Sequence, residues 1–351
     1  MHSAVIPDTW RGVTPAPMSS TDAYNGFIAA NVIFALDRIG VLERIGRGEP
    51  LSAAEAAQSA ASAGDVARTE AVLRAAADYG FLKADGAGYL PTEAGREVAS
   101  ARGYFTWAVG GYHDVFGRAG HLSAGTHHYQ QDVFRDEAMV ALGSAQCDQS
   151  MFAAQLTDVL DGIDFRLIAD LGSGTSARVR RVVSQREGSR GLGIDISRPA
   201  TDIARREIAE AGLEDRVTAV RADVLGLLGT QIDNDAEAAE VAEVDTVMSF
   251  FLLHDLLADP ATRSSIFTRM REAFPKARTF VLGDTMLRGP GESQSTLPVF
   301  SVGFELAHAM MGVPLHTKET YEQLFADAGL RIDRVEALAT PHSWLYVLQA
   351  D

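Results

Sequence analysis

The first part of the chain carries apolar residues at helical spacing. In the segment 27–42 they cover nearly every face of the helix that they predict: Phe27, Ile28, Val32, Ile33, Leu36, Ile39 and Leu42. Thr21 or Asp22 can cap the start of this helix with a side-chain oxygen. Because so apolar a helix needs more than one packing partner, we expect it to contribute to a dimer interface.

Two alanine-rich helical segments, 51–60 and 66–79, lead into two short β-rich runs around an Asp-Gly turn at 81–92. Helix, helix and hairpin in this order are typical of a winged-helix motif. A DNA-binding motif needs a basic second helix, whereas this one has more acidic than basic residues: Asp65, Glu70 and Asp78 against Arg68 and Arg74. We therefore expect a structural wing.

Prolines and periodicity divide the chain into three parts. Residues 1–20 hold three prolines and little periodicity, which predicts an extended N-terminal arm. Residues 21–160 are predicted to form a helical winged-helix domain for dimerisation, with a helical lid over 93–160. Residues 161–351 alternate between β-rich and helical runs and are predicted to form the cofactor-binding domain.

This last part predicts an α/β fold. Its β-rich runs lie at 165–171, 191–196, 217–222, 244–252, 279–284, 330–338 and 343–349. Helical stretches between the first five favour parallel strands, whereas the short link 339–342 permits an antiparallel hairpin and excludes a parallel crossover. The pattern predicts a Rossmann-like sheet that is mainly parallel, with one reversed strand.

A glycine-rich turn follows the first of these runs. Gly172 and Gly174 come after Asp170 and let the backbone approach a ligand closely. Asp195, at the end of the next run, is at the right distance along the chain to bond ribose hydroxyls. The turn therefore predicts a site for a nucleotide-type cofactor.

With Ala177 in place of a third glycine, the turn could also satisfy the dinucleotide pattern of a nicotinamide enzyme. Asp223, which follows the third run and could accept from an adenine amino group, disfavours this alternative, as does the reversed hairpin. The residues that carry a different resemblance are Asp170, Gly172, Gly174, Asp195 and Asp223. They resemble the motifs of class I S-adenosylmethionine-dependent methyltransferases.

The resemblance extends over nearly the whole chain from about residue 22. The wing, the segment 92–96, the helical lid and the segment 252–255 are similar to the O-methyltransferase type that acts on small molecules. Val224 and Phe250 join the residues that this resemblance assigns to S-adenosylmethionine. It also implies a homodimer formed through the N-terminal domains.

Composition limits the classes of binding partner and the cellular compartment that we expect. The formal net charge of −16 argues against nucleic acid, because a phosphate backbone requires a basic surface. The single cysteine, Cys147, cannot form an intramolecular disulfide, so a reducing cytoplasm fits and an inert buried thiol is expected. We find no signal peptide pattern, and the segment 27–42 is too short and too polar to span a membrane.

His254 and Asp255 directly follow the fourth predicted strand. Ligands of open α/β sheets lie beyond the carboxyl ends of the strands, so this pair is expected to face the methyl group of the cofactor. In the O-methyltransferases that the chain resembles, the matching histidine is a general base that takes a phenol proton, and an Asp or Glu orients it. We interpret Asp284, at the end of the fifth strand, as sheet-end structure.

A second imidazole extends this pair to a metal site. The segment 300–311 predicts a helix after the fifth strand and carries His308. His254, Asp255 and His308 form a two-histidine, one-carboxylate ligand set that leaves positions on a divalent ion for a chelating substrate. Zinc, iron, nickel and cobalt all accept this set, and His316 is the alternative third ligand.

The three ligands resemble those of the metal-dependent α-keto acid C-methyltransferases of peptide natural product pathways. The resemblance implies that Arg135 and Trp107, in the lid, hold the keto acid substrate. Phe304 and the apolar residues near it are expected to line a pocket for a branched or aromatic side chain.

The implied reaction is methylation of C3, the β-carbon, of an apolar α-keto acid, with 4-methyl-2-oxopentanoate or phenylpyruvate as substrate. It would proceed through a metal-chelated enolate, because a C–H beside a ketone is a poor acid. The alternative is an O-methyltransferase of a phenolic small molecule with His254 as general base. A regulator that binds the cofactor without chemistry is disfavoured by the acidic charge and by the His-Asp pair.

Overall fold

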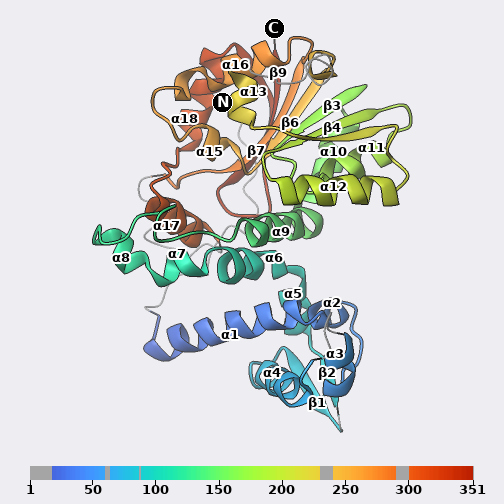
Figure 1. Cartoon of the computed structure of the whole chain (residues 1–351), viewed down its shortest axis with the longest axis vertical. Helices are drawn as coiled ribbons and strands as arrows, with labels where there is room; N and C mark the ends of the chain where they lie inside the picture. The colour runs from blue at the N-terminus through green and yellow to red at the C-terminus, as the bar shows by residue number, and fades with distance from the viewer. Residues whose placement is uncertain (1–17, 60–63, 87, 230–239, 290–299, 351) are drawn as a thin grey trace. The chain divides into compact units, whose positions relative to one another are not determined.

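The structure is a computed structural model that describes residues 18–59, 64–86, 88–229, 240–289 and 300–350 (Figure 1). Most of the predicted arm at 1–20 lies outside the described residues. Packing divides the chain into two compact units, one within Pro15–Ser150 and the other within Met151–Asp351. This division falls earlier in the chain than the predicted boundary at 160.

The N-terminal unit contains the winged-helix elements that the sequence predicted. Their bounds are α1 (Ser20–Arg38), α2 (Val41–Gly46), α3 (Ala53–Ser59), α4 (Val66–Asp78), β1 (Leu82–Asp85), β2 (Gly88–Pro91) and α5 (Glu93–Ser100). The two strands pair antiparallel and form the wing. Apolar side chains of α1, α2 and α4, with Leu36, Ile45 and Leu73 fully buried, make up the core of this unit.

The first helix ends earlier than the apolar pattern over 27–42 predicted. Gly40 has a φ of +74°, in the left-handed region that favours glycine, and the helix ends before it. At the start, Ser19 rather than either predicted residue caps the helix, because its Oγ accepts from the amide of Asp22 at 3.0 Å. Phe27, one of the apolar residues of this helix, is 67% exposed.

The predicted lid is helical. It consists of α6 (Arg102–Phe105), the π-helical segment η2 (Thr106–Gly111), α7 (His113–Gly117), α8 (Ala119–Ser123) and α9 (Glu137–Cys147). A second π-helical segment, η3 (Asp148–Phe152), continues α9 into α10 (Ala153–Asp161). Cys147 is buried, as predicted, and burial raises the pKa of its thiol to about 12. A thiol with so high a pKa is protonated near neutral pH.

The second unit is built on a seven-stranded sheet with the order β5-β4-β3-β6-β7-β9-β8. The strands are β3 (Leu167–Leu171), β4 (Arg190–Asp195), β5 (Val217–Arg221), β6 (Thr246–Phe250), β7 (Thr279–Thr285), β8 (Leu330–Ala337) and β9 (Ser343–Ala350). Neighbours among β3 to β7 pair parallel, whereas β9 pairs antiparallel with both β7 and β8. The predicted α/β fold with one reversed strand is confirmed.

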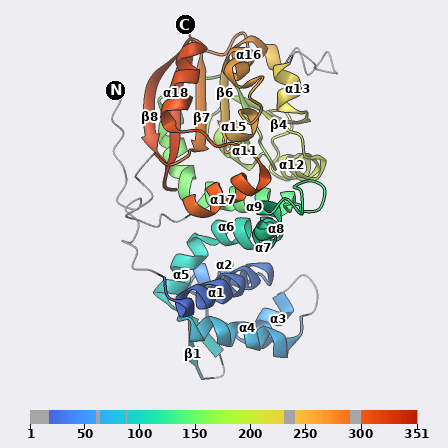
Figure 2. The same ribbon diagram turned by 90° about the vertical axis from the view of Figure 1, so that its left-hand side faces the viewer.

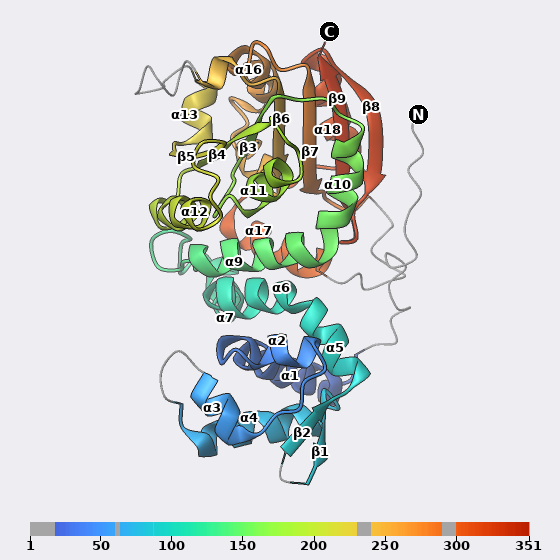
Figure 3. The same ribbon diagram turned by 90° about the vertical axis from the view of Figure 1, so that its right-hand side faces the viewer.

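Helices cover both faces of this sheet. The helices that follow α10 in this unit are α11 (Ala177–Ser184), α12 (Arg198–Glu210), α13 (Val224–Leu228), α15 (Leu253–Leu256), α16 (Ile266–Ala273), α17 (Ser301–Met311) and α18 (Lys318–Asp327). Figure 2 shows α16 and α18 in front of the sheet, and Figure 3 shows α10 and α11 in front of the opposite face. Covering both faces explains why the central strands β3 and β6 are buried at every position.

The sheet order also fixes where a ligand can bind. The chain runs from β3 outward through β4 to β5, and then returns to β6 on the other side of β3. The strand order therefore reverses between β3 and β6, and the crevice beyond their carboxyl ends is the expected ligand site of such a fold. In the described part of the chain, no helix has the length and apolarity needed to cross a bilayer.

Candidate active site

The glycine-rich turn between β3 and α11 is held against the end of β4. Gly172 and Gly174 have φ values of +71° and +55°, as the predicted close approach to a ligand requires. The amide of Gly174 donates to Asp195 Oδ2 at 2.8 Å, and the amide of Gly172 donates to the carbonyl of Ile194 at 2.9 Å. The turn and Asp195 thus form one connected cradle at two adjacent strand ends.

Two other residues that the resemblance assigned to the cofactor lie at the ends of β3 and β6. Asp170 is fully buried, and its Oδ1 lies 3.2 Å from a terminal nitrogen of Arg178, in the first turn of α11. The guanidinium of Arg178 in turn lies 4.3 Å from the centroid of the Phe250 ring. A carboxylate, a guanidinium and an aromatic ring therefore meet at the reversal of the strand order.

The third strand end contributes Asp223, which caps α13 by accepting from the amide of Leu225 at 3.0 Å. Val224 is buried beside it. Sequence reasoning missed two apolar side chains that remain exposed close to the acidic residues, Ile196 at 62% and Leu225 at 43%. In the sequence, each of them lies within two positions of an acidic residue at a strand end. Apolar side chains of this kind suit the faces of a flat adenine ring.

If a cofactor binds in the cradle, a side chain at position 174 should interfere with it. A Cβ added there would meet no protein atom within 4 Å, so its side of the turn is open. We predict that Gly174→Ala lowers the melting temperature only by the few degrees that a left-handed alanine costs, about 1 kcal/mol. Affinity for S-adenosylhomocysteine, measured by calorimetry, is expected to fall at least about tenfold, because the methyl group would occupy ligand space.

Gly188 provides the matched control for this prediction. It has a φ of +78°, and a Cβ there would also meet nothing within 4 Å, but it precedes β4 at the opposite end of the strand. Gly188→Ala should cost similar stability and leave the affinity unchanged. Equal losses of affinity in both variants would contradict a ligand at the turn.

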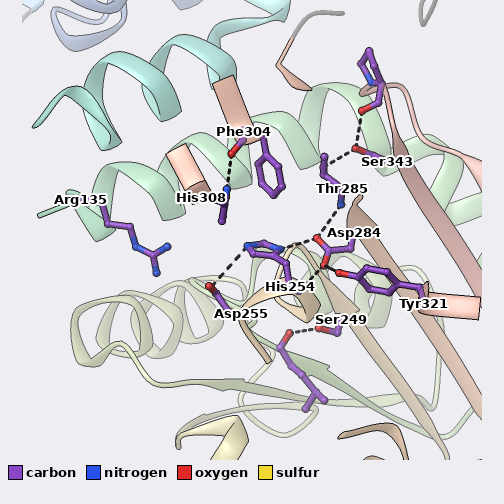
Figure 4. Close-up of polar contacts among 12 residues, drawn as sticks. Arg135, Ser249, His254, Asp255, Asp284, Thr285, Phe304, His308, Tyr321 and Ser343 are labelled. Carbon is purple, nitrogen blue, oxygen red and sulfur yellow. Dashed lines mark hydrogen bonds and ion pairs between the residues drawn. The ribbon is translucent and has the colours of Figure 1, made fainter. Parts of the chain in front are cut away.

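His254 lies beyond the end of β6, in the short helix α15. Its backbone amide donates to Asp284 Oδ2 at 2.7 Å, and its ring Nδ1 lies 2.9 Å from Asp284 Oδ1 (Figure 4). Because a carboxylate accepts hydrogen bonds, Nδ1 carries a ring proton, and in the neutral imidazole the lone pair is then on Nε2. His254 is thus fixed both through its backbone and through its ring.

Asp284 lies near the end of the sheet, as predicted, and is also hydrogen-bonded to His254. It is fully buried near the end of β7, and its carboxylate accepts from four groups. These are the amide and Nδ1 of His254, the amide of Thr285 at 2.9 Å and the hydroxyl of Tyr321 at 2.9 Å. Its position could have been inferred, since β6 and β7 are neighbours whose carboxyl ends meet at one edge.

The helix α17 brings His308 against His254. The ring centroids lie 4.7 Å apart, nearly perpendicular, and both rings contact Phe304. Nδ1 of His308 lies 2.7 Å from the carbonyl oxygen of Phe304, which can only accept, so the lone pair of His308 is also on Nε2. Both imidazoles therefore have the tautomer that a metal ligand or a general base requires.

Asp255 lies farther from the ring of His254 than Asp284 does, and faces the other ring nitrogen. Its Oδ2 lies 3.9 Å from Nε2 of His254, and its side chain is one third exposed. Within the described residues, no group of three or more His, Cys, Asp or Glu has the arrangement of a metal site. Two adjacent ligands of one octahedral ion lie about 3 Å apart. The three predicted ligands fit a divalent cation in kind and tautomer, and Asp255 would have to move closer to bind it.

The other predicted site residues belong to both units: His316 to the second, and Trp107 and Arg135 to the N-terminal one. His316 precedes α18, its Nε2 is 3.4 Å from the carbonyl oxygen of Leu257, and burial together with the charge of Arg263 lowers its pKa.

Trp107 is buried in η2, where its ring packs on Tyr112 at a centroid distance of 4.1 Å. Arg135 belongs to the same N-terminal unit. Substrate contacts of Arg135, Trp107 and Phe304 stay predictions.

Comparison with known proteins gives a consistent picture. No family model matches the chain. A methyltransferase of Aspergillus campestris, ungE', is 28% identical over 250 residues, which cover 68% of this chain and 70% of that protein. The indolepyruvate C-methyltransferase of Streptomyces griseus is 28% identical over 285 residues, 80% of each chain. Among solved structures, PigF with S-adenosylhomocysteine covers 94% of this chain and 99% of its own, with a TM-score of 0.64 and 19% identity.

Proposed function

Because this chain is a class I S-adenosylmethionine-dependent methyltransferase of the O-methyltransferase-like type, we propose that it methylates C3 of an apolar α-keto acid in natural product biosynthesis. The observation that carries the proposal is the second imidazole. His308 faces His254 at 4.7 Å, and hydrogen bonds leave the lone pair of both rings on Nε2. A phenol requires only one base, whereas a keto acid benefits from a site that stabilises an enolate.

The similarity to the Streptomyces protein supports the substrate class. That protein is named for indolepyruvate, which is an α-keto acid with an aromatic side chain, and the similarity covers 80% of both chains. For this chain we propose a branched or aromatic keto acid, with 4-methyl-2-oxopentanoate and phenylpyruvate as the first candidates. Arg135 would hold the carboxylate as a bidentate partner, and Trp107 and Phe304 would contact the side chain.

In this proposal, His254, Asp255 and His308 would hold one divalent ion, which is zinc, iron, nickel or cobalt. When bound, the ion would supply Lewis acidity that stabilises the negative charge of the enolate. Asp284 keeps the Nε2 of His254 directed at the site, as a carboxylate behind a ligand histidine does. In the overall reaction, the substrate would give up one C3 proton to solvent, C3 would attack the sulfonium methyl in line, and S-adenosylhomocysteine would be released.

Metal content can distinguish His308 from His316 as the third ligand. Protein purified without chelator should contain about one divalent ion per chain by elemental analysis. His308→Ala is expected to lose this ion and the keto acid activity, whereas His316→Ala, whose ring faces Leu257, should retain the ion. A wild-type protein without metal that still methylates keto acids would contradict the three-ligand proposal.

The function itself is tested with a panel of substrates. Purified enzyme, S-adenosylmethionine and either 2-oxo acids or phenols are incubated, and products that gain one methyl group are detected by mass spectrometry. A keto acid deuterated at C3 should lose one deuterium when it is methylated. Methylation of a phenol oxygen, with every keto acid recovered unchanged, would overturn the proposal.

A second candidate is methylation of a phenolic hydroxyl with His254 as general base. The observation in its favour is the pair formed by His254 and Asp284, which is complete without any ion. Such a pair can take a proton through Nε2 while the carboxylate stabilises the charged ring. In this candidate, His308 would serve only to pack against Phe304 and His254.

We also propose that the chain forms a homodimer through its N-terminal unit. Near the start of α1, large apolar side chains are exposed, including Tyr24 and Phe27 at 67% each. A second copy of the same helix would cover them, as in an interface with two-fold symmetry. A cytoplasmic location and the absence of nucleic acid partners stay predictions from composition.

A further inference from the structure

A buried ion pair lies where the strand order reverses, beside the cradle of the cofactor. Asp170 in β3 is fully buried, and the side chain of Arg178 keeps only 11% of its exposure. The two are 3.2 Å apart, and Arg178 belongs to the first turn of α11, directly after the glycine-rich turn. Burying a charged pair costs desolvation free energy, and further hydrogen bonds to the two groups offset this cost. We therefore looked for a group that the pair could bind.

The guanidinium is also fixed by an aromatic ring. The Phe250 ring lies 4.3 Å from it, and a Cβ added at Gly283 would come within 2.6 Å of that ring. Glycine at 283, on the neighbouring strand β7, therefore leaves the room that the ring occupies. The guanidinium therefore contacts the Phe250 ring and, on β3, the carboxylate of Asp170. Such an arrangement holds an arginine fork in one orientation.

The cofactor brings a matching group to this place. Besides adenosine, S-adenosylmethionine carries an amino acid end with an α-carboxylate and an α-ammonium group. Asp195 and the glycine turn locate the ribose at the ends of β3 and β4, and the sulfonium methyl must reach His254 beyond β6. The amino acid end therefore has to lie near the crevice between β3 and β6, which holds Arg178.

We propose that Arg178 binds the carboxylate of the cofactor's amino acid end, with Asp170 and Phe250 as positioning residues that orient its guanidinium. The planar fork matches a carboxylate through two parallel hydrogen bonds. Asp170 balances the arginine charge, so that the cationic sulfonium is tolerated nearby. The inference rests on the assignment of S-adenosylmethionine and is independent of whether carbon or oxygen is methylated.

Two ligands that differ only in the carboxylate test the proposal. They are S-adenosylhomocysteine and 5′-deoxy-5′-(3-aminopropylthio)adenosine, which lacks that group and keeps the amine. Calorimetry with Arg178→Met should show an affinity for S-adenosylhomocysteine about 10- to 100-fold below that of the wild type, and a nearly unchanged affinity for the amine. Arg178→Lys should lose less, because it keeps the charge but not the fork.

Arg180→Met is the matched control, since Arg180 lies on the same helix and pairs with Glu207 of α12 instead. It should lower neither affinity by more than about twofold. If Arg178→Met weakens both ligands equally, or neither, the arginine has no role toward the carboxylate and the inference is overturned. If the wild type binds no S-adenosylhomocysteine at all, the cofactor assignment fails as well, and with it the proposed function.

Discussion

Replacing His254 with glutamine is expected to lower kcat at least about a thousandfold with whichever substrate the panel identifies. The imidazole is the group that both candidate reactions require, as a metal ligand for the keto acid or as a base for the phenol. Glutamine keeps a similar volume beside Phe304 but offers no nitrogen lone pair at the site. The measurement is kcat under saturating S-adenosylmethionine.

His128→Gln controls for the loss of an imidazole as such. His128 is exposed in the N-terminal unit, and its backbone and ring are near Asp132. Its variant should keep the wild-type rate within a factor of about two. The affinity of His254→Gln for S-adenosylhomocysteine should also stay close to that of the wild type. A His254 variant with normal turnover would show that the reacting group lies elsewhere in the crevice.

Asp284→Asn should have the second largest effect, a loss of about 100- to 10,000-fold in kcat. The amide keeps the shape of the carboxylate, but its nitrogen can face Nδ1 of His254 and favour the other ring tautomer, which removes the lone pair from Nε2. Three other groups now bonded to the carboxylate would also have to share a single acceptor oxygen. Single-turnover kinetics separate this loss from slow product release.

Tyr321→Phe serves as the graded control for Asp284. It removes one of the four hydrogen bonds to the carboxylate and leaves His254 in contact with both oxygens. We expect a loss of at most about tenfold in kcat, in keeping with one hydrogen bond to a charged group. If Asp284→Asn costs no more than Tyr321→Phe, the tautomer of His254 is not set by this carboxylate.

Much of the fold could be predicted because its signals are local. Buried β-rich runs, the helices between them and the short link at 339–342 determine a parallel sheet with a reversed strand. The end of α1 was missed for a local reason as well. Continuous apolar periodicity outweighed Gly40, whose left-handed backbone ends the helix.

The site was harder to predict because it depends on which side chains meet. Asp255 is adjacent to His254 in sequence, yet the partner that orients the ring is Asp284, thirty positions later. Adjacent residues of a helical turn point in directions about 100° apart, whereas residues at the ends of paired strands can converge. Tyr321 comes from α18, and no sequence pattern links it to either residue.

The pairing of β9 with β7 has a consequence for biosynthesis. Asp284 lies in β7, which pairs with β9 along its whole length, and Thr285 is bonded to Ser343 at 2.7 Å through their hydroxyls. Until β9 has left the ribosome, β7 is an uncovered edge, and the carboxylate that orients His254 lacks its final support. A nascent polypeptide that stops before residue 343 should therefore be catalytically silent, although every residue proposed to touch substrate or cofactor has already been translated.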